Sequence, residues 1–397
     1  MWVVIIGFDI RLIRNIVAGI TRQLVLVQSY YPLGWELKER NEMFTSLSKS
    51  FMASILIVFC FLSLPSSVFS DVQPVVDQIN GLPDNERNQI LLEGAKKDGV
   101  VNWYTDMQPR NAEAVVKMLG ERHPFLKVEV VRLGHERLIN RLNTEYRAGK
   151  FIPDVITAPS SFVEELKGAG IITRNAAPFR KFVRQGLGDT EGWVNAVTTT
   201  FYTVFYNTNL VKSADLPKKY QDLLHPRWKG LIAIDQEDAE WLGGLIETMG
   251  RENAIEFAKK LAANKPNIRR GHTLLGQLVA GGESAIFPDQ YLHSGINLKK
   301  AGAPVEMYFM DPVLTQSSDA MWVARRASRP HAGMFFIDFL FSRDVQTMLA
   351  GFGRLASRQD VSLLYGLDSK RIHYLSRQWV GENYRELNRL FREIFAE

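Results

Sequence analysis

Several polar side chains of this sequence stand directly after short apolar runs, where a folded chain can present them to a ligand. The clearest group is Arg269-Arg-Gly-His-Thr273, in which Arg270, His272 and Thr273 stand at the start of an expected helix. A guanidinium, an imidazole and a hydroxyl beside a helix N-terminus are typical of an anion-binding cluster. The structural alternative is a solvated turn in which Thr273 only caps the helix.

The same placement recurs after other expected strands. The further candidate ligand-binding residues are Tyr104, Thr105 and Asp106, Ser160 and Ser161, Trp241, and Asp289 with Tyr291. Tyr202, on a long strand, either faces the site or belongs only to the sheet. Each candidate has a structural alternative, because Ser and acidic residues also cap helices and a Trp or Tyr also packs in a core.

Two stretches partly match sequence motifs of enzymes, but neither match is complete or in the right structural context. His135-Glu136 begins like a zinc-protease motif, but Ile139 stands where the second His belongs. Gly351-Phe-Gly-Arg-Leu-Ala356 matches a dinucleotide fingerprint by letters only, since it follows a helical stretch and not a strand. The sequence also lacks a Gly-x-Ser-x-Gly elbow and a Walker loop. We therefore expect no enzyme activity, no catalytic residues and no resident cofactor.

The elements that position these residues alternate between strand and helix. Apolar runs bounded by turn residues predict strands at 99–105, 126–131, 153–158, 198–207, 230–235, 284–288, 305–310 and 319–324. This alternation predicts an α/β fold with mixed, mostly parallel sheets flanked by helices. Two such sets separated by the long strand at 198–207 predict two lobes, with a ligand site at the carboxyl ends of the strands.

The first 70 residues differ from the rest. An uncharged apolar run, Phe51–Leu64, follows Lys49 and precedes a small-residue site ending at Ser70, which is typical of a secretory signal peptide. Fourteen residues are too few to span a bilayer, which takes about 20. We expect residues 43–70 to be this signal, cleaved near Ser70, and residues 1–42 to reflect a start codon placed too far upstream.

Composition then excludes several classes of protein. The chain has 397 residues, 46% hydrophobic and 23% charged, with a formal charge of +5, so it is neither disordered nor a strongly basic nucleic-acid binder. Its one cysteine, Cys60, lies in the expected signal. The exported chain would therefore have no disulfide and no thiol chemistry. The expected organisation is a helical segment at 71–98, lobe 1 at 99–198 with about 308–350, lobe 2 at 199–307, and C-terminal helices at 351–397 packed on lobe 1.

The order of several short motifs resembles the extracellular solute-binding proteins of ABC transporters, of the iron(III)-type group. The matching stretches are EGAKKDGVVNWYT (93–105), PDVI (153–156), VFYNT (204–208), LLHPRWKGLIAID (223–235), RGHT (270–273), KAGAPV (300–305) and FIDFL (336–340). The resemblance implies a type II periplasmic-binding fold whose lobes hinge on crossing strands and close over a ligand. It also implies a periplasmic monomer that delivers a small molecule or ion to an ABC permease of the inner membrane.

The same resemblance implies a tyrosine ligand for iron at Tyr104 and a pair of adjacent tyrosines near residue 290. This chain has only Tyr291 there, preceded by Gln290. Fe(III) favours several anionic oxygen ligands, so the missing tyrosine disfavours iron held by Tyr104 and Tyr291. We expect a small organic or anionic solute, with Fe(III) as the alternative. A ligand-sensing partner of a membrane receptor is the alternative role, since the sequence does not separate sensing from transport.

Overall fold

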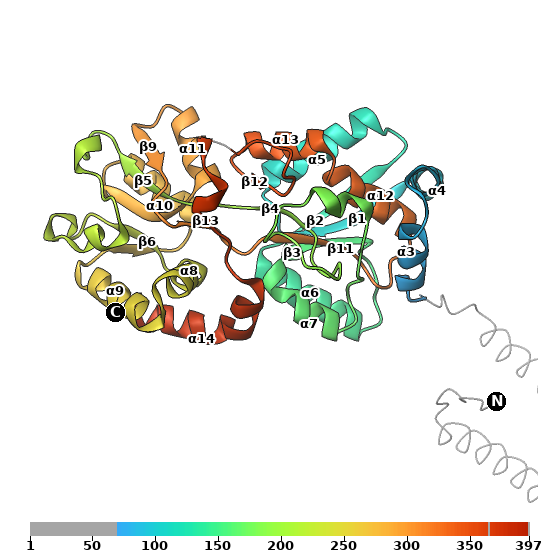
Figure 1. The fold of residues 1–397 in the computed structure, drawn as a ribbon, viewed down its shortest axis with the longest axis horizontal. Coiled ribbons are helices and arrows are strands. Elements are labelled where there is room, and N and C mark those ends of the chain that lie inside the picture. Colours follow the sequence, from blue (N-terminus) through green and yellow to red (C-terminus); the bar gives the residue numbers. More distant parts are fainter. Residues whose placement is uncertain (1–69, 364–365, 396–397) are drawn as a thin grey trace, which may run out of the picture. The chain divides into compact units, whose positions relative to one another are not determined.

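A computed structural model describes residues 70–363 and 366–395 (Figure 1). The expected upstream segment 1–42 and, except for Ser70, the expected signal peptide 43–70 lie outside the described residues, so both stay predictions. Within the described part, no helix is long and apolar enough to cross a membrane.

Lobe 1 is built on a mixed six-stranded sheet. In order across the sheet, its strands are β12 (Leu355–Ala356), β4 (Ala196–Thr199), β11 (Asp319–Val323), β3 (Val155–Pro159), β1 (Val100–Thr105) and β2 (Lys127–Arg132). β1 pairs in parallel with β2 and β3, whereas β11 runs antiparallel to β3 and β4. The strands are almost wholly buried at β1, β3 and β11, as expected for a sheet covered on both faces.

Helices cover both faces of this sheet, with α5, α12 and α13 on one side and α6 and α7 on the other (Figure 1). The helices of lobe 1 are α3 (Gln73–Asn80), α4 (Asp84–Asp98), α5 (Pro109–Arg122), α6 (His135–Arg147), η1 (Ser160–Phe162), α7 (Val163–Gly168), η2 (Pro178–Phe182), α12 (Pro330–Leu340) and α13 (Arg343–Gly351). Trp103 of β1 meets Phe336 of α12 edge to face, with ring centroids 5.1 Å apart. Apolar residues of sheet and helices thus share one core.

Lobe 2 contains several smaller sheets. β5 (Tyr202–Asn207) lies between β8 (Ile286–Tyr291) and β9 (Val305–Tyr308), and β6 (Ala233–Asp235) pairs in parallel with β7 (Asn267–Arg269). The helices of lobe 2 are η3 (Ser213–Asp215), η4 (Tyr220–Leu224), η5 (Pro226–Trp228), α8 (Ala239–Met249), α9 (Arg251–Ala263), α10 (His272–Ala280) and α11 (Leu292–Lys300). A separate hydrophobic core includes Trp241, Leu245 and Phe257.

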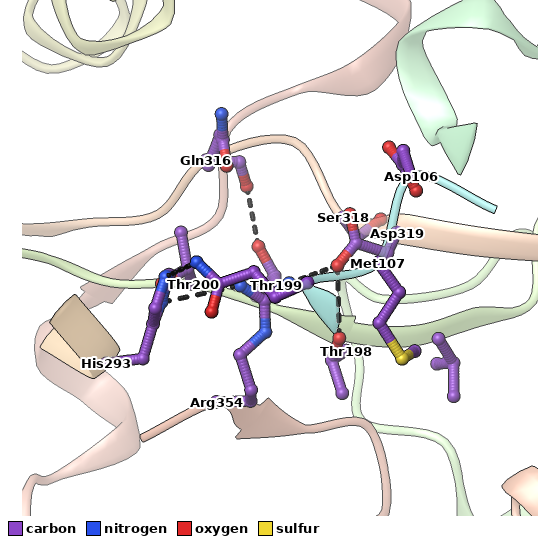
Figure 2. Close-up of polar contacts among 12 residues, drawn as sticks. Asp106, Met107, Thr198, Thr199, Thr200, His293, Gln316, Ser318, Asp319 and Arg354 are labelled. Atoms are coloured by element: carbon purple, nitrogen blue, oxygen red, sulfur yellow. Dashed lines mark hydrogen bonds and ion pairs between the residues drawn. The ribbon is translucent and has the colours of Figure 1, made fainter. Parts of the chain in front are cut away.

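Two of the segments that cross between the lobes lie side by side, and the single long strand predicted at 198–207 is wrong at this point. The chain leaves the six-stranded sheet after Thr199 and enters the other lobe at Tyr202, so the run forms two strands in different sheets. The return segment lies beside it, because Thr199 Oγ1 donates to the carbonyl of Gln316 at 2.8 Å (Figure 2). We call residues 199–201 and 315–318 the hinge.

The C-terminal helix α14 (Arg377–Phe395) packs on lobe 2, which corrects the prediction that the C-terminal helices pack on lobe 1. Leu387, Phe391, Ile394 and Phe395 join the core of lobe 2. The short strand β13 (Ile372–His373), which follows η7 (Ser369–Arg371), pairs with β10 (Val313–Leu314) and brings the chain to this lobe. The strongly amphipathic pattern of α14 then finds its apolar partner on α8 and α9.

Candidate ligand-binding site

A cavity of about 260 Å³ lies where strands of both lobes end. Its walls come from lobe 1, lobe 2, the hinge and α14. The lining residues are His135, Pro159, Phe162 and Asp319 from lobe 1, Asp235, Glu237, Asp238, Ala239, Glu240, Gly271, His272 and Tyr291 from lobe 2, Gln316 and Ser317 from the hinge, and Tyr384 and Asn388 from α14. Its place at strand ends agrees with the general rule for α/β folds.

The end of β6 and the turn after it supply three carboxylates of the cavity, those of Asp235, Glu237 and Asp238. Asp235 accepts hydrogen bonds from the backbone N–H groups of Glu237 (3.0 Å) and Gly271 (2.9 Å). Asp238 is the N-cap of α8 and also accepts a 2.5 Å bond from the Tyr202 hydroxyl. Asp238 therefore both caps α8 and forms part of one wall of the cavity.

Glu240 links this wall to the hinge. Its carboxylate accepts hydrogen bonds from the backbone N–H of Ser317, at 2.8 Å, and from the Ser317 hydroxyl. Burial raises the pKa of Glu240, and burial likewise raises the pKa of Asp235, because few charges of opposite sign lie close enough to offset the loss of water.

His272 and Tyr291 form a stacked pair beside the carboxylates. Their ring centroids are 3.6 Å apart, and His272 Nε2 lies 3.0 Å from an oxygen of Asp238 and 3.6 Å from one of Asp235. The Tyr291 hydroxyl accepts a 2.8 Å bond from the side-chain amide of Gln316. Burial, followed by repulsion from four neighbouring carboxylates, raises the pKa of Tyr291 well above its usual value, so the phenol is neutral.

Lobe 1 faces this wall with two ion pairs. Asp106, after β1, contacts His135 Nδ1 at 2.6 Å. Burial alone would lower the pKa of His135, but the bond to Asp106 and other carboxylates outweigh burial and raise it to about 9. Asp319, at the start of β11, pairs with Arg354 and accepts a 3.2 Å bond from Thr198 (Figure 2).

Among the residues expected from the sequence, His272 and Tyr291 line the cavity. Three others stand directly behind the lining: Asp106 bonds His135, Tyr202 bonds Asp238, and Asp289 accepts from the backbone N–H of Asp235 at 3.2 Å. The Ser160 hydroxyl accepts from Ser318, which is not a lining residue, at 2.9 Å. Ser161 is 9% exposed and its hydroxyl has no hydrogen-bond partner.

Other expected site residues lie elsewhere. Tyr104 is fully buried under α6, where its hydroxyl donates to Glu145 (3.2 Å) and accepts from Arg141 (3.0 Å), so it is not among the lining residues. Thr105 is buried and its hydroxyl accepts a bond from the backbone N–H of Met107. Trp241 is a core residue with no exposed surface. The alternation of side chains along β1 and the apolar face of α8 explain these positions.

The predicted anion-binding cluster does not form. The Arg270 side chain is 73% exposed and pairs with Glu237 at 2.9 Å, and Thr273 is exposed. His272 alone turns inward, toward carboxylates and not toward a site for an anion.

Sequence reasoning missed the contributions of His135, Glu240, Asp319 and α14. His135 and Asp319 stand at element boundaries beside strand ends, which is a usable signal. Tyr384 and Asn388 gave no such signal, because only the tertiary path of α14 brings residues so late in the chain to the cavity.

Comparison with known proteins identifies the family. Residues 150–384 match the family described as bacterial extracellular solute-binding protein. The chain belongs to this family. A search of curated proteins finds no match.

Solved solute-binding proteins share the fold at low sequence identity. Iron-bound HitA from Pseudomonas aeruginosa is 18% identical with a TM-score of 0.65, and the match covers 74% of this chain and 99% of HitA. The ferric binding protein from Campylobacter jejuni is 20% identical with a TM-score of 0.63, and the match covers 74% of this chain and 99% of that protein. AfuA from Actinobacillus pleuropneumoniae, with fructose-6-phosphate bound, is 16% identical with a TM-score of 0.63, and the match covers 75% of this chain and 99% of AfuA.

These neighbours confirm the predicted two-lobed type II periplasmic-binding fold. Members of this family bind small ligands and deliver them to ABC permeases. HitA is iron-bound whereas AfuA has fructose-6-phosphate bound, so the shared fold does not assign a cargo to this chain.

Proposed function

We propose that this chain is the periplasmic substrate-binding component of an ABC importer. It captures one small organic solute between its lobes and hands it to an inner-membrane permease, acting as a monomer and without catalysis. The observation that carries this proposal is the cavity at the strand ends, whose walls come from both lobes, the hinge and α14. A ligand that touches both lobes favours their closed arrangement, as import requires.

The test is a thermal-shift screen of the purified protein with cationic, neutral and anionic metabolites, followed by calorimetry. A true ligand raises the melting temperature by mass action and binds one to one. Small-angle scattering should then show a smaller radius of gyration for the complex. A screen with no stabilising compound and no compaction would contradict the proposal. The permease role is tested by copurification of the loaded protein with the permease encoded beside it.

Ferric ion is the second candidate cargo, because the Tyr291 phenol and several carboxylates meet in one cavity and Fe(III) favours oxygen ligands. Against it, the described residues contain no group of three or more His, Cys, Asp or Glu arranged to hold a metal ion, and Tyr104 lies elsewhere. Loading with ferric citrate would give a tyrosinate charge-transfer band that Tyr291→Phe abolishes. A colourless, metal-free protein after loading would exclude iron.

A further inference from the structure

Acidic side chains outnumber basic ones around the cavity. The described residues that line it include acids and histidines but no Lys or Arg. Two of the acids are already paired, Asp319 with Arg354 and Glu237 with Arg270. Of the three that remain, Asp235 and Asp238 lie 3.6 and 3.0 Å from His272 Nε2, and Glu240 accepts only from Ser317. The other lining imidazole, His135, is already paired with Asp106. Even with His272 protonated, the lining carries surplus negative charge.

One of these carboxylates, Asp238, has an oxygen without a hydrogen-bond partner. Asp238 is 4% exposed, and its Oδ1 accepts bonds from the Tyr202 hydroxyl and from the Trp241 backbone N–H. Its Oδ2 lies 3.0 Å from His272 Nε2 but has no hydrogen-bond donor. A buried carboxylate whose second oxygen has only the nearby His272 ring for compensation is costly, so positive charge in the adjoining cavity would stabilise it.

Aromatic rings form the remaining surface. Phe162 from lobe 1, Tyr291 from lobe 2 and Tyr384 from α14 all line the cavity, and the rings of Phe162 and Tyr384 pack edge to face with centroids 5.7 Å apart. Aromatic faces attract organic cations, whereas a bare metal ion would gain little from them and needs converging ligands. A volume of about 260 Å³ also suits a small organic molecule better than an ion.

We propose that the cargo is a small organic ammonium ion, whose positive nitrogen lies against Asp238 and its carboxylate neighbours while its carbon atoms pack on the rings of Phe162, Tyr291 and Tyr384. This inference rests on the proposed function, because it names the substrate class of the same cavity. It replaces the anionic cargo that Arg270 and Thr273 suggested in the sequence.

Matched sets of compounds test the charge alone. The first set is choline, 3,3-dimethylbutan-1-ol and 3,3-dimethylbutanoate; the second is 1,4-diaminobutane, 1,4-butanediol and butanedioate. Calorimetry on the full chain should show binding of at least one ammonium member, with its neutral and anionic partners at least roughly tenfold weaker. Choline against 1,4-diaminobutane distinguishes an alkylated from a primary ammonium group. Tighter or equal binding of a neutral or anionic member would overturn the inference.

Asp238→Asn provides the matched variant, because the amide oxygen keeps both bonds at Oδ1, while an uncharged NH₂ group replaces Oδ2 beside His272. It should melt within about 3 °C of the wild type yet bind the ammonium probe roughly 10- to 100-fold more weakly. The control Asp368→Asn makes the same change at an exposed turn-capping position and should leave binding unchanged.

The two hypotheses fail in different ways. Unchanged ammonium binding in Asp238→Asn, or preference for an anionic, neutral or ferric probe, overturns the charge assignment and leaves the importer role standing. Failure of every class of compound to bind overturns both.

Discussion

At the residue scale, the site is set by carboxylates that are buried before any ligand arrives. Burial raises the pKa of Asp235 and Glu240 because the charged form loses water. A cation in the cavity favours the ionised form and so lowers the same pKa. Ligand binding and proton release are therefore linked.

The linkage predicts that an ammonium ligand binds more weakly as the pH falls from 7.5 to 5.5, because protonated carboxyls must first lose their protons. Calorimetry at pH 6 in two buffers of different ionisation enthalpy should reveal protons released on binding. In Asp235→Asn the released amount should be smaller, since one titrating group is gone. Proton uptake on binding, or affinity that rises with acid, would contradict this linkage.

The Asp106–His135 pair predicts a pH effect on the alkaline side. Its bond raises the pKa of His135 to about 9 in the folded chain, above the ordinary value of about 6.5 in the unfolded chain. The stabilisation is therefore fully present below about pH 6.5 and is lost as the pH rises through about 9. In urea titrations, His135→Gln should show a smaller loss of unfolding free energy between pH 7 and 9.5 than the wild type. His225→Gln, at an exposed turn, should retain the wild-type slope.

At the element scale, α14 contacts both lobes and also lines the cavity. It packs its apolar face on lobe 2, while its second turn lies against the turn after β3 in lobe 1. Gly381 allows this approach, because a Cβ there would stand 2.7 Å from the carbonyl oxygen of Ser161. Tyr384 and Asn388, one and two turns further on, then reach the cavity.

Gly381→Ala should therefore push α14 away from lobe 1. Overpacking of this kind costs about 1–3 kcal/mol, and we expect it to appear as roughly 5- to 100-fold weaker binding of an ammonium probe. Gly120→Ala in α5 adds a methyl group in open space and should leave binding unchanged while stabilising the helix slightly. Equal affinity of Gly381→Ala and wild type would show that α14 does not belong to the ligand site.

The strands and the site residues differ in how well they could be predicted from the sequence alone. Most strands were predictable, because β1, β3 and β11 are apolar runs between turns. The break at Thr200–Phe201 was not, since Thr, Phe and Tyr favour a strand throughout and only the change of sheet interrupts it. His272 and Tyr291 were found from their positions beside strand ends, but the direction of Tyr104 depends on α6 and that of Arg270 on Glu237, contacts that spacing does not encode.

At the scale of the whole molecule, the lobes also meet away from the cavity. Gln108, at the start of α5, contacts His293 of α11 at 2.6 Å, and Arg110 donates to Asn297 at 2.8 Å. These side chains join lobe 1 to lobe 2. Apparent affinity depends on the population of the binding-competent arrangement, so these remote contacts contribute to binding without touching the ligand.

The double variant Gln108→Ala/Asn297→Ala should therefore loosen the lobes. Two spin labels, at Lys117→Cys in lobe 1 and Lys260→Cys in lobe 2, report the distance between lobes in a Cys60→Ser background. Both native side chains are well exposed, at 79% and 61%. Loss of two hydrogen bonds, about 1 kcal/mol each, should shift the ligand-free distances to longer values and weaken probe binding by roughly 10- to 30-fold.

Asn253→Ala is the control, because it breaks a side-chain bond that stays within lobe 2. It should change neither the distances nor the affinity. The decisive comparison is between the two readouts in the double variant. If the distances lengthen and affinity falls together, closure and capture are one equilibrium. If affinity falls while the distances stay as in the wild type, closure does not limit capture, and the cavity binds its cargo without a movement of the lobes.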